Sequence, residues 1–260
     1  MQTLILGLVQ GLAEWLPISS TAHLRIVEHF FGLAATPLFN VVLHAGTLVV
    51  VVLYFRKDVI DILSALAHMD FRSGRGHLIP LIVVATVPTA IIGLLYVAFL
   101  EDVLQTMLAI GVTLLIGATV VYVSKNGSEK TDVITYKTAL AMGVAQGLAV
   151  FPGLSRSGVT VSTALLLGLK REEAFRFSFL LSIPAILGDL IVETYKQRGQ
   201  LAIQNVGSVE LLAGVIVAMV VGYLAIGFVS RIVESRRLHY FAFYTWLLGI
   251  AVIALTLSGF

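Results

Sequence analysis

Six runs of apolar residues, each near the length of a membrane-crossing helix, constrain this chain more than any other feature. They cover residues 38–55, 78–100, 104–123, 177–195, 209–230 and 240–258. A helix needs roughly 20 apolar residues to cross the hydrocarbon core of a bilayer. The runs therefore predict an all-α polytopic membrane protein, which crosses the bilayer several times and has the bilayer as a partner.

Composition excludes the ordinary soluble classes. Hydrophobic residues make up 58% of the 260 positions and charged residues 12%, against about 25% charged in soluble domains. The net charge is only +2 and no basic run is interleaved with aromatics, so we expect no nucleic-acid partner. Cysteine is absent, which excludes disulfides and thiolate metal sites. The apolar N-terminal stretch has no basic leader and soon meets Gln10 and Glu14, so a cleaved signal peptide is not expected.

Two further segments are helical in pattern but broken by proline and polar residues, at about 1–35 and 139–175. Each reads as a pair of short helices that enters the membrane and turns back. Irregular backbone at membrane depth is tolerated only where protein or a wet cavity covers it. We therefore expect both breaks to line a buried site.

The two broken segments resemble each other. Residues 7–13 and 143–149 share the string Gly-x-x-Gln-Gly-Leu-Ala, followed in each case by an aromatic, a proline and a serine cluster. The chain thus looks like two copies of one unit, about 1–123 and 139–258, within a single membrane domain. Each unit holds one re-entrant helix pair and three transmembrane helices. Three is odd, so the second copy must be inverted relative to the first.

Basic residues in the short loops predict the orientation. With the N-terminus outside, the outer side keeps few basic residues and an acidic loop at Glu101 and Asp102. We therefore expect both termini outside. The cytoplasmic side then receives Arg56, Lys57, Arg72, Arg75, Lys125, Lys130, Lys137, Lys170, Arg171, Arg176, Arg231, Arg236 and Arg237.

The first break carries most of the candidate catalytic residues. Pro17 cannot continue the preceding helix, and Ser19 is suited to cap the next one. The amides of the three residues after Ser19 would point out of a helix N-terminus, which favours a phosphate. His23 lies three residues after Ser20, so the two share a helix face. Glu14 precedes the break and is aimed at the same turn.

The second break repeats this design and adds an arginine. Pro152 breaks the chain, Ser155 is placed to cap the next helix, and Ser157 and Thr160 fall on one face of it. Arg156 presents a planar fork of donors that can grip a phosphate in two places. The pattern predicts an anion site between the two breaks.

A structural interpretation stands beside each functional one. Serine and threonine in membrane helices usually bond a neighbouring carbonyl, and Glu14 and Arg156 could form an ion pair with no further role. An ionisable group in the bilayer is nevertheless costly and tends to be functional. The convergence of an acid, a histidine, an arginine and two serine clusters favours a site.

Four more polar residues lie in the predicted spans. Asp189 and Glu193 are four apart on one face; we place Glu193 near the outer interface in a structural role and leave Asp189 open. His44 and Asn40 either line the same cavity or pair with each other.

The two breaks resemble the signature motifs of the undecaprenyl-pyrophosphate phosphatases, the BacA-type bacitracin-resistance family. The matching stretches are Gln10-x-x-x-Glu14 followed by residues 16–23, and residues 152–160. The resemblance covers nearly the whole chain. It implies a plasma-membrane enzyme that hydrolyses a C55 polyprenyl diphosphate to the monophosphate, recycling the lipid carrier of cell-envelope glycans. The functional residues of the family fall here on Glu14, Ser20, Thr21, His23 and Arg156.

Six polar residues of the two motifs are expected to bind the substrate, together with Gln146 of the repeated string at residues 143–149. They are Gln10, Ser19, Thr21, Gln146, Ser155, Ser157 and Thr160. Many family members carry Glu where this chain has Gln10, and Gly where it has Ala22. The neutral Gln10 puts a two-carboxylate metal site in doubt, so we expect no tightly bound cofactor, while a divalent cation, Mg²⁺ or Ca²⁺, and a homodimer stay open.

The sequence is compatible with two catalytic mechanisms and with one alternative function. In the first scheme Ser20 attacks the terminal phosphorus, Glu14 with help from His23 removes its proton, and Arg156 stabilises the phosphate oxygens. In the second, His23 is the nucleophile. The rival is a transporter or flippase of a polyprenyl phosphate or another anionic lipid, which would also use inverted repeats but would need no nucleophile and base.

Overall fold

The computed structural model describes residues 2–32, 37–201 and 208–259. Over these ranges the chain is helical, and its β-structure is limited to an isolated bridge between Thr131 and Leu169. The all-α prediction is therefore confirmed. The calls at residues 33–35 lie outside the described residues.

Twelve α-helices follow one another in the described ranges. The segments predicted to form the first re-entrant pair are α1 (Gln2–Ala13) and α2 (Ser20–Phe31), and those predicted to form the second are α8 (Tyr136–Leu148) and α9 (Arg156–Leu166). The others are α3 (Pro37–Tyr54), α4 (Arg56–Ala67), α5 (Leu78–Leu95), α6 (Glu101–Leu104), α7 (Met107–Val123), α10 (Arg171–Leu201), α11 (Ser208–Glu234) and α12 (Phe241–Leu257). Short turns of 3₁₀ or π helix connect several of them, at Gly74–His77, Tyr96–Leu100, Ser124–Asn126 and Leu238–Tyr240.

Each of the six predicted apolar runs lies largely within a helix. Five helical stretches of the described chain are long and apolar enough to cross a membrane, and a sixth is reached if the bent pair α3 and α4 counts as one span. Many large apolar side chains face outward, among them Phe99, Leu224 and Leu247. Such a surface suits a protein whose solvent is partly lipid.

The sequence does not predict helix α4, because Arg56 and Lys57, directly after the apolar run, are typical of a cytoplasmic loop. Helix α4 leaves α3 at an angle of 85°. Its apolar residues Ile60, Leu63 and Leu66 are exposed and recur at helical spacing, and the helix also carries the charged residues Arg56, Lys57, Asp58 and Asp61. An amphipathic helix of this kind is suited to lie in the interface between lipid and water.

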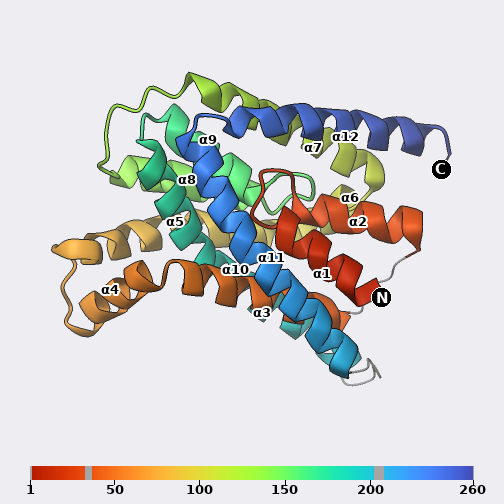
Figure 1. Ribbon diagram of the computed structural model, residues 1–260, viewed down its shortest axis with the longest axis horizontal. Coiled ribbons are helices and arrows are strands. Elements are labelled where there is room, and N and C mark those ends of the chain that lie inside the picture. Colours follow the sequence, from red (N-terminus) through yellow and green to blue (C-terminus); the bar gives the residue numbers. More distant parts are fainter. Residues whose placement is uncertain (1, 33–36, 202–207, 260) are drawn as a thin grey trace.

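The re-entrant helices pack against spans that are distant in the sequence. Helix α1 packs on α11, α8 packs on α5, α7 packs on α12, and α3 packs on α10 (Figure 1). Glycines allow the closest approaches: a Cβ added at Gly7 would lie 2.2 Å from the carbonyl oxygen of Gly214, and one at Gly143 would lie 2.1 Å from that of Ala85. Small residues at such crossings let two helix backbones touch.

The buried centre holds both breaks in place. Trp15, in the first break, is 1% exposed and stacks on Phe179 of α10 with ring centroids 5.4 Å apart. The start of α1 and the end of α12 lie at one end of the molecule, and α4 lies at the other (Figure 1). The first re-entrant pair therefore approaches the centre from the end that carries both chain ends.

Candidate active site

The first break is built by a proline and a serine cap. Pro17 follows the end of α1, and Ser19 caps α2 by accepting a hydrogen bond from the amide of Ala22 at 3.4 Å. The predicted cap is confirmed. The expectation of three free amides was wrong in one respect: the cap itself occupies the Ala22 amide, which leaves those of Ser20 and Thr21 at the helix start.

Ser19 adopts an unusual backbone conformation, with φ 71° and ψ 103°. A side chain other than glycine rarely takes a positive φ, and such conformations concentrate at functional sites, where the surrounding structure holds them. The break is therefore a shaped turn that sets the direction of Ser20 on the first turn of α2.

Glu14 is the centre of the polar cluster. The Ser20 hydroxyl donates to its Oε2 at 2.7 Å, and the Gln10 amide donates to the same oxygen at 3.1 Å. Arg156 donates from Nη2 to the other oxygen, Oε1. The side chain of Glu14 is 9% exposed and that of Arg156 is 17% exposed. The structure thus brings together the acid, the serine and the arginine from three different helical segments.

The second break is tied directly to the first. Ser155 caps α9 by accepting from the amide of Gly158 at 3.2 Å, as predicted. The hydroxyls of Ser155 and Ser157 both donate to the carbonyl of Leu16, at 3.2 and 3.3 Å. The arginine that lies between these two serines is thereby fixed against the first break. Its guanidinium also lies 5.8 Å above the ring of Trp15.

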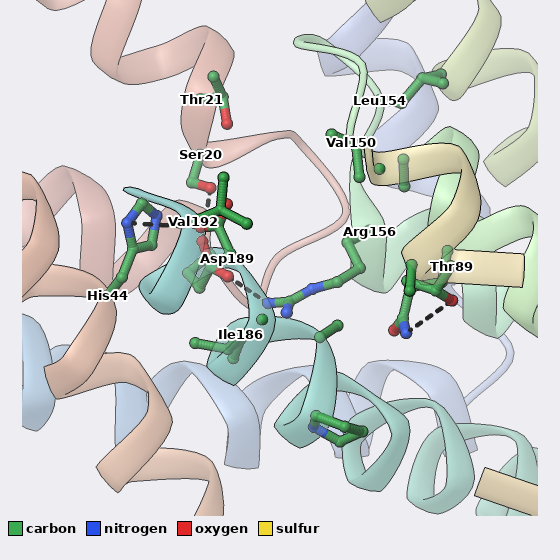
Figure 2. A pocket seen from close by; sticks show the side chains of 18 of the residues that line it. Ser20, Thr21, His44, Thr89, Val150, Leu154, Arg156, Ile186, Asp189 and Val192 are labelled. Atoms are coloured by element: carbon green, nitrogen blue, oxygen red, sulfur yellow. Dashed lines mark hydrogen bonds and ion pairs between the residues drawn. The ribbon is translucent and has the colours of Figure 1, made fainter. Parts of the chain in front are cut away.

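A cavity of about 430 Å³ lies between the two breaks. Its polar wall is formed by the first-turn residues of α2 and by Arg156, and its other walls come from α3, α5, α8 and α10. Figure 2 shows Ser20, His44, Asp189 and Arg156 around this space, with apolar side chains such as Ile186 beside them. A polar end joined to apolar walls suits a lipid with a charged headgroup.

His23 does not line the cavity. Its Nδ1 lies 2.7 Å from the carbonyl oxygen of Ser19, and its Nε2 lies 2.8 Å from the hydroxyl of Tyr244 on α12. The ring also stacks on that of Tyr244, with centroids 5.7 Å apart. His23 shares the first turns of α2 with Ser20, but its side chain is directed at α12.

Three of the expected substrate-binding residues also lie away from the main cavity. Gln10 is fully buried behind Glu14, with its side-chain oxygen left without a hydrogen-bond partner among the described residues. Thr160 donates to the carbonyl of Arg156 at 2.7 Å and pairs with Ser178. The hydroxyl of Ser157 donates a hydrogen bond to the carbonyl of Leu16 in the first break. These residues position the charged pair.

The other expected substrate-binding residues line the cavity. They are Ser19, Thr21, Gln146 and Ser155. The amide of Gln146 donates to the carbonyl of Leu181 at 3.2 Å and to Thr89 at 3.4 Å, so it joins α8 to α10 and α5.

The sequence predicts no role for Thr89 or Asp189, and it leaves His44 open between lining the cavity and pairing with Asn40. Thr89, His44 and Asp189 all line the space. Nδ1 of His44 lies 4.0 Å from Oδ2 of Asp189, which joins α3 to α10. The available signal was that His44 and Asp189 are ionisable residues inside apolar runs, which is a costly placement. Thr89 carried no signal, because threonine is common in membrane helices.

The described residues contain no group of three or more histidines or carboxylates that could hold a metal ion. Glu14 is already paired with Arg156, and Gln10 brings a neutral amide where a second carboxylate would be needed. The residues present therefore do not fit a fixed divalent-metal site of the usual oxygen-rich kind.

A serine hydrogen-bonded to a carboxylate, at a helix start and beside an arginine, defines a membrane-embedded site for phosphoryl chemistry. Comparison with known proteins agrees with this class. The chain belongs to the bacitracin resistance protein BacA family, whose model matches residues 3–251.

Relatives align with the chain almost end to end. The undecaprenyl-diphosphatase of Korarchaeum cryptofilum is 40% identical over 263 residues, covering 98% of each chain. That of Carboxydothermus hydrogenoformans is 38% identical over 265 residues, covering 99% of this chain and 98% of its own. Undecaprenyl-diphosphatase 3 of Bacillus cereus is 39% identical over 259 residues, covering 98% and 96%.

Proposed function

We propose that this chain hydrolyses undecaprenyl diphosphate to undecaprenyl phosphate and inorganic phosphate. Such an activity recycles the lipid carrier of cell-envelope glycan synthesis and confers resistance to bacitracin. The family and the names of its relatives support this activity. The observation that carries it is the 2.7 Å hydrogen bond from Ser20 to Glu14 inside the cavity that Arg156 lines.

In the first step Ser20 Oγ attacks the terminal phosphorus of the diphosphate. Glu14 accepts the hydroxyl proton, a bond forms between Oγ and phosphorus, and the bond from that phosphorus to the bridging oxygen breaks. The bridging oxygen leaves with the electron pair as part of the polyprenyl monophosphate. Arg156 and the amides of Ser20 and Thr21 stabilise the charge on the phosphoryl oxygens.

In the second step water releases phosphate from the serine. Once Glu14 has passed its proton to the departing monophosphate, its carboxylate can take a proton from the attacking water. The bond from phosphorus to Ser20 Oγ then breaks, and the hydroxyl is restored. The same carboxylate serves both halves of the reaction, so one acid is enough.

The alternative nucleophile, His23, is less well placed. Both ring nitrogens of His23 have near partners, the Ser19 carbonyl and the Tyr244 hydroxyl, and the ring is outside the cavity lining. The position of Ser20 in the lining, with its proton already directed at Glu14, supports the serine scheme.

The function is tested by measuring phosphate release from undecaprenyl diphosphate by the purified protein in detergent or nanodiscs. We expect one phosphate and one monophosphate lipid per substrate consumed. A protein that binds the diphosphate lipid but releases no phosphate, with or without Mg²⁺ or Ca²⁺, would be a carrier instead. The carrier is not favoured, because a carrier has no need for a serine directed at a carboxylate.

We also propose that the two halves are inverted repeats of one unit. The helix packing supports this proposal. Helix α1 of the first half packs on α11 of the second, and α8 of the second half packs on α5 of the first. The two aligned glycines, Gly7 and Gly143, make the corresponding contacts in each half. Both breaks are also capped by a serine.

The proposed orientation places both termini outside the plasma membrane. The start of α1 and the end of α12 lie at the end of the molecule opposite α4, whose start carries basic residues. Single cysteines can test this, because the chain has none of its own. Asp102→Cys and Ser258→Cys should react with an impermeant maleimide from outside, and Arg72→Cys and Ser128→Cys only after the membrane is opened. The reverse pattern at any two positions would overturn both the orientation and the inverted repeat.

A further inference from the structure

His44 reaches the cavity from α3 and has no role in the scheme above. Figure 2 shows its imidazole and the guanidinium of Arg156 extending into the space from opposite sides. The side chain is 28% exposed, so the ring is mostly enclosed by protein and yet borders the space that would hold the headgroup.

The Nδ1 atom of His44 is buried and makes no hydrogen bond to any described residue. Its nearest acid, Asp189, has Oδ2 at 4.0 Å, which is within ion-pair range but too long for a hydrogen bond. Buried polar atoms are normally hydrogen-bonded. Asp189 therefore lies beside the imidazole but does not supply the missing hydrogen bond to Nδ1.

The charges that line the cavity do not suit a diphosphate as they stand. Two carboxylates, Glu14 and Asp189, border the space together with one arginine, and that arginine is already paired with Glu14. A diphosphate monoester carries two or three negative charges near neutral pH. Such an anion needs more positive charge than Arg156 supplies.

The charged groups on the helices around α3 leave His44 as the source of that charge. On α10, Glu193 lies one turn beyond Asp189, and Lys196 is held by Glu101 in an ion pair. On α11, the stretch facing Gly46 presents the uncharged Val215 and Met219. Among the described residues that line the cavity, His44 is therefore the side chain, besides Arg156, that is able to carry a positive charge.

We propose that His44 is a second cationic contact for the diphosphate, and that a proton is taken up at His44 when the substrate binds. Before binding, Asp189 keeps the imidazole at the cavity wall. With the diphosphate bound, the protonated imidazole donates a hydrogen bond to a phosphate oxygen across from Arg156. The proposal rests on the proposed function for the identity of the ligand.

Calorimetry with a ligand that cannot be hydrolysed tests the inference separately from turnover. The probe is a C15 polyprenyl diphosphate analogue with a methylene bridge between its phosphorus atoms. Titrations at pH 7 in two buffers of different ionisation enthalpy give the number of protons taken up. We expect net uptake by the unsubstituted chain, loss of most of it in His44→Gln, and binding weaker by about tenfold, the lower range for a charge-assisted hydrogen bond.

Two further variants identify the titrating group. Asp189→Asn should retain the proton uptake, because the imidazole is still present. His68→Gln, which removes an imidazole at the end of α4 outside the cavity lining, should match the unsubstituted chain. Unchanged uptake in His44→Gln, or uptake that is lost in Asp189→Asn but kept in His44→Gln, would overturn the proposal. His44→Asn serves as a second test if the glutamine variant does not fold.

Turnover of the corresponding C15 diphosphate separates binding from chemistry. His44→Gln should raise KM about tenfold and change kcat by less than about threefold. A loss confined to kcat would refute a binding role. If the unsubstituted chain releases no phosphate, the proposed phosphatase activity is wrong. The calorimetric result still tests the contact between His44 and the diphosphate in that case.

Discussion

The two breaks share one design and use it for different ends. In each, a helix stops at a proline and a serine caps the next helix. The first break then leaves the hydroxyl of Ser20 free to face Glu14. In the second break the hydroxyls of Ser155 and Ser157 donate hydrogen bonds to the carbonyl of Leu16. In the proposed scheme the first break is the reacting half, because it supplies the nucleophile and the base, and the second is the holding half, because its serines fix Arg156 beside them.

Backbone conformation separates the two breaks further. Ser19, which caps α2, has φ 71°, whereas Ser155, which caps α9, has φ −80°. In the second break a positive φ falls on Gly153 instead, where it costs little. A strained serine costs about 1–3 kcal/mol and persists only when its surroundings impose it. The reacting half therefore carries strain that the holding half avoids.

The largest expected effect comes from the reacting half. Ser20→Ala and Glu14→Gln should each lower single-turnover phosphate release by about a thousandfold or more, because the hydroxyl is a poor nucleophile without its base. The double variant should be little slower than either single one, since the two act together. Substrate binding should survive in Ser20→Ala.

Ser157→Ala is the matched control in the holding half, and its rate should fall by less than about tenfold because the Ser20–Glu14 pair is kept. Two outcomes would contradict the division of roles. One is a control as slow as Ser20→Ala. The other is a Ser20→Ala variant that keeps its rate while His23→Ala loses it, which would make His23 the nucleophile.

Arg156→Lys should have the next largest effect. The planar fork becomes a point charge that can no longer hold two phosphate oxygens, and we expect a loss of about 2 kcal/mol in transition-state stabilisation, or roughly thirtyfold in kcat/KM. Steady-state kinetics on the polyprenyl diphosphate measure it. Turnover within about threefold of the unsubstituted chain would reduce Arg156 to an ion-pair partner of Glu14.

The matching glycines give a smaller effect that tests the likeness of the two halves. Gly7→Ala and Gly143→Ala each place a Cβ against a backbone carbonyl of another helix. Each should destabilise the protein by about 1–3 kcal/mol, the usual cost of overpacking, and by similar amounts. Thermal unfolding in detergent measures the change. Gly227→Ala, whose Cβ would have its nearest neighbour at 3.9 Å, should be neutral or stabilising.

An effect no larger than that of the glycines is expected at the serines that tie the second break to the first. Ser157→Ala loses the hydrogen bonds of its hydroxyl to the Leu16 carbonyl and to the Ser155 hydroxyl, and should cost about 1 kcal/mol of stability. Ser155→Ala loses the same tether and also the helix cap, so it should cost about 1 kcal/mol more. Comparing their unfolding midpoints measures the difference. Equal midpoints would mean that the cap contributes nothing.

The sequence predicted the spans and the breaks because the signals for both are local. Apolar runs give helices in lipid, and Pro17 and Pro152 end them. The convergence of Glu14, Ser20 and Arg156 was also within reach, since the costly ionisable residues stood beside the breaks.

Features that depend on distant packing were out of reach. The direction of His23 is set by Tyr244, 221 residues later. The pairing of His44 with Asp189 requires α3 to lie against α10. Helix α4 was missed for another reason: its apolar stripe is too short to read as a span, and basic residues at its start suggested a loop.

The packing of α1 on α11 has a consequence for the order in which the protein is made. Helix α1 leaves the ribosome well before α11, which provides the surface around Gly214 against which α1 packs. Until α11 has been made, α1 lacks the helix against which it packs. Glu14 likewise lacks its ion-pair partner until Arg156 has been made. A nascent chain therefore cannot complete this site before α11 has been made.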